Sequence, residues 1–175
     1  MLRIALTYGT ISGVASITVI MLGLLMADDV PSAGSQAVGY LIMLVALSII
    51  FFGVKRHRDI NCAGVIRFFP ALGLGLLITA VAGVAYVIVW EIYLAFTGPA
   101  FIESYTAGYI DQQIAAGLAG EELEELRVQM ATMVERYANP LFRIPITFTE
   151  ILPVGVLISL ISAAILRNPR VMPAR

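Results

Sequence analysis

Three ionisable side chains in this sequence, Glu91, Arg143 and Glu150, lie within or beside long apolar stretches. A charged group inside a bilayer is costly, so such a residue usually pairs with another group or serves a function. Glu91 and Arg143 are expected at the same depth, close to one membrane surface, and we predict that they form an ion pair. Glu150 comes ten residues after Pro140, which places it roughly 9–15 Å below that surface.

Glu150 lies between two prolines, Pro145 and Pro153, each of which removes a backbone donor and frees carbonyl oxygens. A carboxyl group in such a kinked helix resembles part of an ion or proton site. The alternative is a protonated Glu that bonds the freed backbone groups, with Thr18 and Tyr86 as further partners. The sequence favours this structural interpretation, because one acid is not a proton relay.

Other catalytic and metal-binding patterns are absent from the sequence. The chain has one His, His57, and one Cys, Cys62, and it contains no G-x-S-x-G, H-E-x-x-H, P-loop or C-x-x-C pattern. Zinc sites and activated nucleophiles need several such side chains together. We therefore expect no enzymatic activity, no metal, no cofactor and no intramolecular disulfide.

Four apolar segments must position these residues. The 175-residue chain is 59% apolar and only 13% charged, with a mean hydropathy of +0.91, which is typical of a membrane protein rather than a soluble domain. A membrane-spanning helix needs about 20 apolar residues. We predict an all-α, four-span protein with a single membrane domain over residues 1–175. The predicted spans are residues 4–26, 38–54, 68–96 and 140–166.

Basic residues occur in alternate connections between these segments. The first connection has none and carries Asp28 and Asp29 instead. Because Lys and Arg near helix ends are retained on the cytoplasmic side, the pattern predicts that both termini are cytoplasmic. The basic residues that set this orientation are Arg3, then Lys55, Arg56, Arg58 and Arg67, and finally Arg167, Arg170 and Arg175.

The basic second connection, residues 55–67, is expected to lie against the cytoplasmic membrane surface. Lys55, Arg56 and Arg58 are candidate contacts for anionic lipid headgroups, each worth about 1 kcal/mol near the surface. Membrane lipids are therefore expected partners, and nucleic acid is not. Retention of topology alone would also explain these charges.

Residues 98–139 are the one sizeable polar segment, with seven acids against Arg127 and Arg136. Apolar residues recur at helical spacing on both sides of a break at residues 117–120. We predict an acidic helical hairpin outside the membrane, between the third and fourth spans. Its apolar faces would rest on each other, on the outer helix ends or on a partner. After the break the apolar stripe consists of Leu123, Leu126, Met130, Met133 and Tyr137.

Small residues repeat every four positions in three of the predicted spans. Such spacing lets helix backbones approach closely in lipid, where packing drives association. Packing within one bundle is the simpler interpretation, and homodimerisation is the alternative. The repeats are Ala5, Gly9 and Gly13, then Gly75, Thr79 and Gly83, and finally Gly155, Ser159 and Ala163.

Two strings in the second half of the chain are distinctive: Trp90-Glu91-Ile92-Tyr93, and Asn139-Pro-Leu-Phe-Arg143 followed by Thr147-Phe-Thr-Glu-Ile-Leu-Pro-Val-Gly155. With them, essentially the whole chain closely resembles a bacterial membrane family catalogued as domain of unknown function 4199. The resemblance implies a bacterial four-helix membrane protein. It implies no activity and supplies no catalytic residues.

Two classes of function fit these features. The first is a small accessory, scaffold or assembly component of the bacterial inner membrane, with a membrane-protein partner or a second copy of itself. The alternative is a subunit of an ion- or proton-coupled transporter or channel that uses Glu150. The first is favoured, because four spans with one deep acid rarely make a complete transporter and no inverted repeat is visible.

Overall fold

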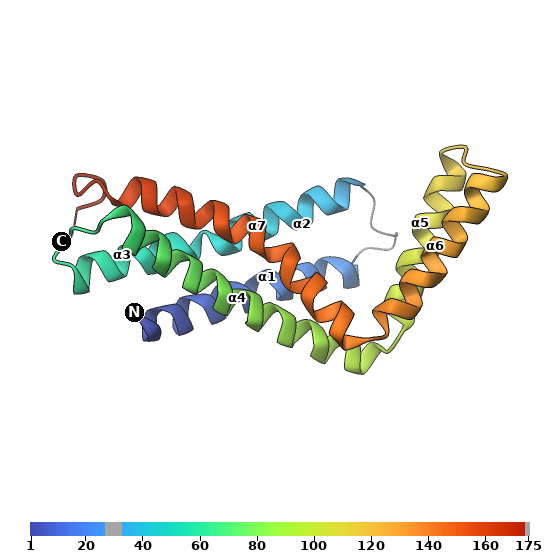
Figure 1. Cartoon of the computed structure of the whole chain (residues 1–175), viewed down its shortest axis with the longest axis horizontal. Coiled ribbons are helices and arrows are strands. Elements are labelled where there is room, and N and C mark those ends of the chain that lie inside the picture. The colour runs from blue at the N-terminus through green and yellow to red at the C-terminus, as the bar shows by residue number, and fades with distance from the viewer. Residues whose placement is uncertain (27–32, 174–175) are drawn as a thin grey trace.

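The computed structural model describes residues 1–26 and 33–173, which form seven helices and no strand (Figure 1). Four stretches are long and apolar enough to cross a membrane: Leu2–Gly23, Ala37–Asn61, Phe68–Thr97 and Pro140–Leu166. The chain is therefore all-helical with four candidate membrane spans, as predicted. The helices are α1 (Leu2–Met26), α2 (Ala33–Leu47), α3 (Ile49–Asn61), α4 (Phe68–Thr97), α5 (Ala100–Ala115), α6 (Glu121–Tyr137) and α7 (Pro140–Leu166).

The spans form a bundle in which α1 and α7 both pack along α4, while α2 and α3 contact α1 and α7. Both chain termini lie at one end of the bundle, here called the termini end (Figure 1). Helices α5 and α6 project from the opposite end, the hairpin end. The orientation of these ends in a membrane stays a prediction from the basic residues. Asp28, Asp29 and Arg175, which contribute to that prediction, lie outside the described residues.

The small-residue repeats mediate the packing of this bundle. Gly13 of α1 lies so close to α4 that an added Cβ would overlap the carbonyl oxygen of Ala82. On the other side of α4, an added Cβ at Gly75 would lie 2.8 Å from the side chain of Ser159 on α7. Helix α4 is therefore held between two close neighbours. The interpretation of the repeats as packing within one bundle is confirmed.

The second span is longer than the predicted 38–54, because α3 continues to Asn61. Its last two turns are polar, and side-chain pairs four residues apart support them. Lys55 forms an ion pair with Asp59, and Nδ1 of His57 lies 3.2 Å from Oδ1 of Asn61. The basic residues predicted for a connection therefore lie on a helix, and only a short loop follows it.

A break at Ser48 separates α2 from α3 within this span. The Ser48 amide is shared between the carbonyl oxygens of Leu44 and Val45, at 3.1 and 3.2 Å. The Ser48 hydroxyl also donates to the Val45 carbonyl, at 2.6 Å. Such hydrogen bonds from Ser to the preceding turn bend helices. The helix of this span is therefore interrupted without a proline.

Helices α5 and α6 pack against each other and form the predicted helical pair. Gly117 and Gly120 have φ values of 98° and 66° in the break between them, and such backbone is available to glycine at little cost. The next helix, α7, begins as predicted: Asn139 accepts a hydrogen bond from the Leu141 amide at 3.0 Å, and Pro140 is its first residue.

Candidate functional site

Glu91 on α4 and Arg143 on α7 form the predicted ion pair at the hairpin end. Nε of Arg143 donates to Oε1 of Glu91 at 2.7 Å, and Nη2 donates to Oε2 at 2.5 Å. Two parallel bonds of this kind are the strongest arrangement between arginine and a carboxylate. The side chains of Arg143 and Glu91 are only 14% and 25% exposed. The pair joins the end of α4 to the beginning of α7.

Tyr137, the last residue of α6, joins the same cluster. Nη1 of Arg143 donates to the Tyr137 carbonyl at 3.0 Å, and the indole Nε1 of Trp90 donates to the Tyr137 hydroxyl at 2.8 Å. Burial raises the pKa of the Tyr137 phenol, so the hydroxyl stays protonated at neutral pH. We call Trp90, Glu91, Tyr137 and Arg143 the hairpin hub, because they connect the hairpin to the bundle.

Aromatic contacts attach the other helix of the hairpin. Phe101 at the start of α5 meets Trp90 edge-to-face, with ring centroids 4.8 Å apart. Tyr93 stacks on Trp90 at 5.4 Å, and Tyr105 stacks on Phe101 at 6.3 Å. Aromatic pairs at these distances are favourable beyond their buried area. Both helices of the hairpin are therefore anchored to α4 at their base.

Glu150 on α7 is exposed, and among the described residues it makes no hydrogen bond or ion pair. The predicted partners do not bond it: Thr18 is itself exposed, and Tyr86 on α4 forms no hydrogen bond with Glu150. The reason is rotational, because the buried face of α7 runs through Ile151 and Gly155. Glu150 lies on the flank of that face.

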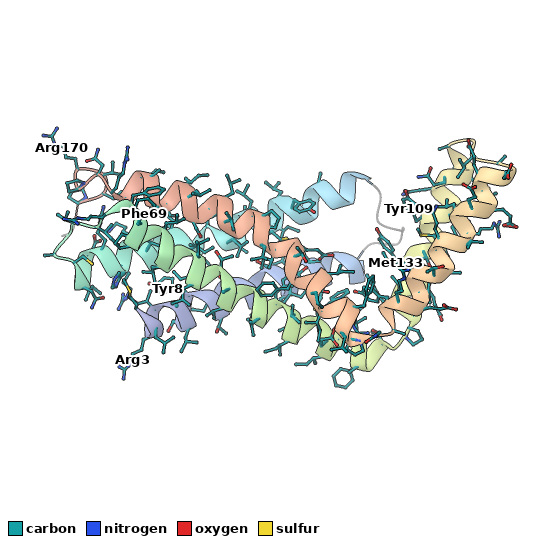
Figure 2. All side chains as sticks on the ribbon, viewed as in Figure 1. Arg3, Tyr8, Phe69, Tyr109, Met133 and Arg170 are labelled. Carbon is teal, nitrogen blue, oxygen red and sulfur yellow. The ribbon has the colours of Figure 1, made fainter. Side chains whose placement is uncertain are left out.

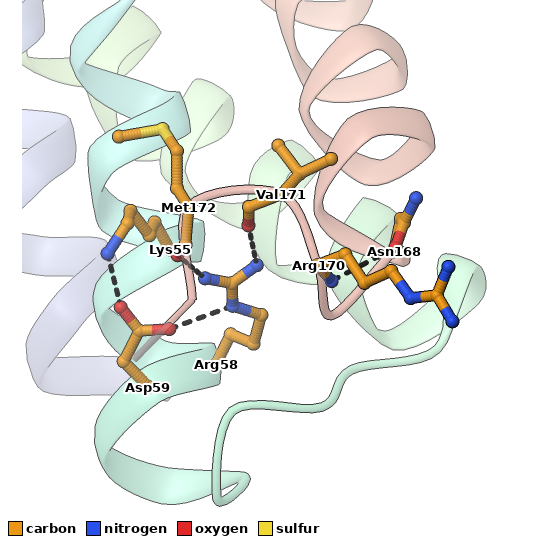
Figure 3. A network of polar contacts seen from close by, with 7 residues as sticks. All are labelled: Lys55, Arg58, Asp59, Asn168, Arg170, Val171 and Met172. Atoms are coloured by element: carbon orange, nitrogen blue, oxygen red, sulfur yellow. Dashed lines mark hydrogen bonds and ion pairs between the residues drawn. The ribbon is translucent and has the colours of Figure 1, made fainter. Parts of the chain in front are cut away.

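Arg58 is fully buried at the termini end, with 0% of its side chain exposed. Its Nη1 donates to the Val171 carbonyl at 2.9 Å and its Nη2 to the Met172 carbonyl at 2.5 Å (Figure 3). Its Nε donates to Asp59 at 2.8 Å. These bonds, the Arg58 clamp, hold the chain after α7 against α3. The predicted lipid contact for Arg58 is therefore wrong, because the guanidinium is buried and its acceptors are protein oxygens.

The other two predicted lipid contacts, Lys55 and Arg56, have different surroundings. Lys55 pairs with Asp59, and its side chain is only 23% exposed. Arg56 is exposed and has no ion pair within the part of the chain that the structure describes. Arg56 is therefore the member of this trio whose charge stays available to a ligand outside the protein.

Residues 7–168 match the family described as protein of unknown function (DUF4199). The chain belongs to this family. The matched region includes the hairpin hub, Glu150 and Arg58, whereas Arg3, Val171 and Met172 lie outside it. No match was found among curated proteins or among solved structures.

Two features of the hairpin hub and the Arg58 clamp were not predicted from the sequence. Tyr137 was predicted only as the last member of an apolar stripe, although it lies two residues before the Asn139 cap of α7 and its hydroxyl accepts a hydrogen bond from Trp90. The Arg58 clamp has no local signal, because its carbonyl acceptors lie 113 and 114 residues further along the chain. Every residue has a backbone carbonyl, so the type of a residue does not show whether its carbonyl accepts a hydrogen bond from Arg58.

Proposed function

We propose that this protein is a small, non-enzymatic scaffold or assembly component of the bacterial inner membrane, and that the hairpin α5–α6 is its docking element. The observation that supports this proposal is the contrast between the base and the body of the hairpin. The hairpin hub fixes the base by hydrogen bonds, an ion pair and aromatic packing. The body of α6 nevertheless contains no buried residue. A rigidly attached helix with a free surface suits recognition of another protein.

The charge of the hairpin indicates the chemistry of the partner. The acids of α5 and α6 are all exposed, and only Arg127 and Arg136 oppose them. A surface of this sign attracts a basic protein surface and raises the rate of encounter. It repels the phosphates of nucleic acid. With both termini in the cytoplasm, the hairpin would meet this partner on the outer side of the membrane.

This docking proposal can be tested by chemical cross-linking in native membranes, followed by mass spectrometry of the partners. A variant with Glu121, Glu122, Glu124 and Glu125 changed to Gln should lose partners that the unmodified protein captures at low salt. Arg127→Gln with Arg136→Gln is the matched control, because it alters the same helix and leaves all its acids in place. Equal capture by the wild type and the quadruple variant would overturn the proposal.

The exposure of Glu150 favours a second candidate function, a subunit of an ion- or proton-coupled transporter. A carboxyl group within a span that the described residues leave without a hydrogen bond is available to an ion or to a neighbouring subunit. Glu150→Gln keeps the shape but cannot ionise. On this reading, the Gln variant should assemble normally and abolish proton- or cation-linked flux in vesicles. Wild-type behaviour of the Gln variant would remove Glu150 as a coupling residue.

A further inference from the structure

A groove of about 590 Å³ opens between α1 and α3 at the termini end. Three of its lining residues, Arg3, Thr7 and Ile11, lie four residues apart on α1. Residues at this spacing share one face of a helix. The facing wall on α3 is formed by Ile49, Phe52 and Arg56, at spacings of three and four residues.

The lining of the groove changes from charged to apolar along its length. Helices α1 and α3 run in opposite directions, so Arg3 near the start of α1 and Arg56 near the end of α3 lie at the same end. Ile11 and Ile49 follow roughly 10–12 Å deeper, at 1.5 Å per residue. A phospholipid in one leaflet has the same order, with its phosphate at the surface and its acyl chains below.

The floor of the groove is part of the helix packing. The ring of Tyr8 lies against Gly53 of α3, where an added Cβ would be only 3.0 Å from the ring atom Cγ. Tyr8 and Ile4 complete the lining on the α1 side. Figure 2 shows Tyr8 within the bundle and Arg3 directed outward from the termini end. The groove therefore has a closed protein floor and a charged rim.

Some charged side chains near the groove are paired within the protein, and others are available to a ligand. Asp59, the acid of α3, is held by Lys55 and Arg58. None of the described residues that line the groove is acidic. Arg3 and Arg56 are exposed and take part in no ion pair among the described residues. Two available guanidinium groups at the mouth of an apolar groove are complementary to one anionic phospholipid.

We propose that this groove binds an anionic phospholipid, with its phosphate between Arg3 and Arg56 and an acyl chain along Thr7, Phe52 and Ile11. This is one defined binding site for a single lipid, which differs from the general attraction of a basic surface for an anionic membrane. It lies at the opposite end of the bundle from the hairpin, so it is independent of the partner proposed above.

Native mass spectrometry of the full chain in detergent tests the site, with dioleoylphosphatidylglycerol as the probe. Arg3→Gln with Arg56→Gln should weaken binding about fivefold per arginine, or roughly 25- to 30-fold together. Arg67→Gln with Arg170→Gln is the matched control, because both are exposed arginines at the termini end that do not line the groove. The control should change binding less than twofold. Equal weakening by the two double variants would show diffuse attraction and overturn the site.

Two further measurements test the headgroup and the acyl chain. Dioleoylphosphatidylcholine, which has the same chains without net charge, should bind the wild type and both double-arginine variants equally and weakly. Tight and arginine-independent binding of this lipid would contradict the proposal. Ile11→Trp should fill the apolar half and weaken phosphatidylglycerol binding severalfold, whereas Ile161→Trp on exposed α7 surface should not. Unchanged binding by Ile11→Trp would overturn the placement of the chain.

Discussion

A single guanidinium joins three helices at the hairpin end of this protein. Arg143 belongs to α7, bonds the Glu91 carboxylate on α4 and bonds the Tyr137 carbonyl at the end of α6. Removal of one partner from a shielded ion pair leaves the other charge uncompensated. The hairpin hub should therefore respond to single substitutions more strongly than an exposed surface pair would.

Glu91→Gln and Arg143→Met should each lower the free energy of unfolding. The double variant should lose less free energy than the two single variants lose together. We expect a coupling energy of about 1–3 kcal/mol, because the bidentate pair is mostly shielded. Reversible unfolding in detergent gives the free energy of unfolding for the wild type, the two single variants and the double variant. Strictly additive losses would mean that the two residues stabilise the protein independently.

Tyr137→Phe removes the acceptor of the Trp90 indole and should cost about 1–3 kcal/mol, because a shielded donor is left without a partner. Trp90 is the single tryptophan of the chain, so its fluorescence reports directly on this bond. Tyr105→Phe is the control, since Tyr105 stacks on Phe101, whereas the Trp90 indole donates to Tyr137. Emission from Trp90 that is identical in wild type and Tyr137→Phe would contradict the hydrogen bond.

At the scale of the elements, α4 is the helix on which the bundle depends, because close contacts hold it on two sides. Gly13 of α1 meets its backbone at Ala82, and Gly155 of α7 meets its Thr79 side chain. Neither contact leaves space for a larger residue. Gly73 also belongs to α4, but nothing lies within 4 Å of a Cβ added there.

Gly13→Ala should destabilise the protein by about 1–3 kcal/mol, because the new methyl group forces α1 away from α4. Gly73→Ala should be neutral or stabilising, since Ala favours helix and the site is open. Unfolding in detergent compares the two variants. Equal stability of Gly13→Ala and the wild type would show that α1 can move away from α4 without a loss of stability.

Hydropathy and helix signals predicted α1, α4 and α7 closely, and depth alone predicted the Glu91–Arg143 pair. The second span was predicted to end at residue 54, although its helix continues to Asn61, because hydropathy does not register pairs such as Lys55–Asp59, which extend a helix through polar sequence. The predicted hydrogen-bond partners of Glu150 were wrong for another reason. Depth is readable from residue spacing, but the face of α7 that meets a neighbour depends on tertiary packing.

At the scale of the whole molecule, the two ends of the bundle carry opposite charge. The hairpin end carries exposed acids, and the termini end carries exposed arginines on four different helices or their flanks. A membrane protein with such ends has a preferred orientation, because basic residues resist translocation. The same asymmetry gives each end its own class of partner.

Maleimide labelling of single cysteines tests this orientation in a Cys62→Ser background. Glu122→Cys on the hairpin should react with a membrane-impermeant reagent in intact cells, and Arg170→Cys should react only after the membrane is opened. Both positions are exposed in the structure, so access depends on the membrane rather than on burial. Labelling of Glu122→Cys only from the cytoplasmic side would reverse the assignment.

The Arg58 clamp imposes an order of events during biosynthesis. Arg58 leaves the ribosome 113 residues before Val171, its first carbonyl acceptor in the C-terminal segment. At typical rates of about 5–20 residues per second, that interval is roughly 6–23 s. During these seconds the guanidinium lacks two of its three acceptors, and its charge can help retain the second connection on the cytoplasmic side. Only after Val171 and Met172 have been synthesised can the same side chain become a buried structural cation.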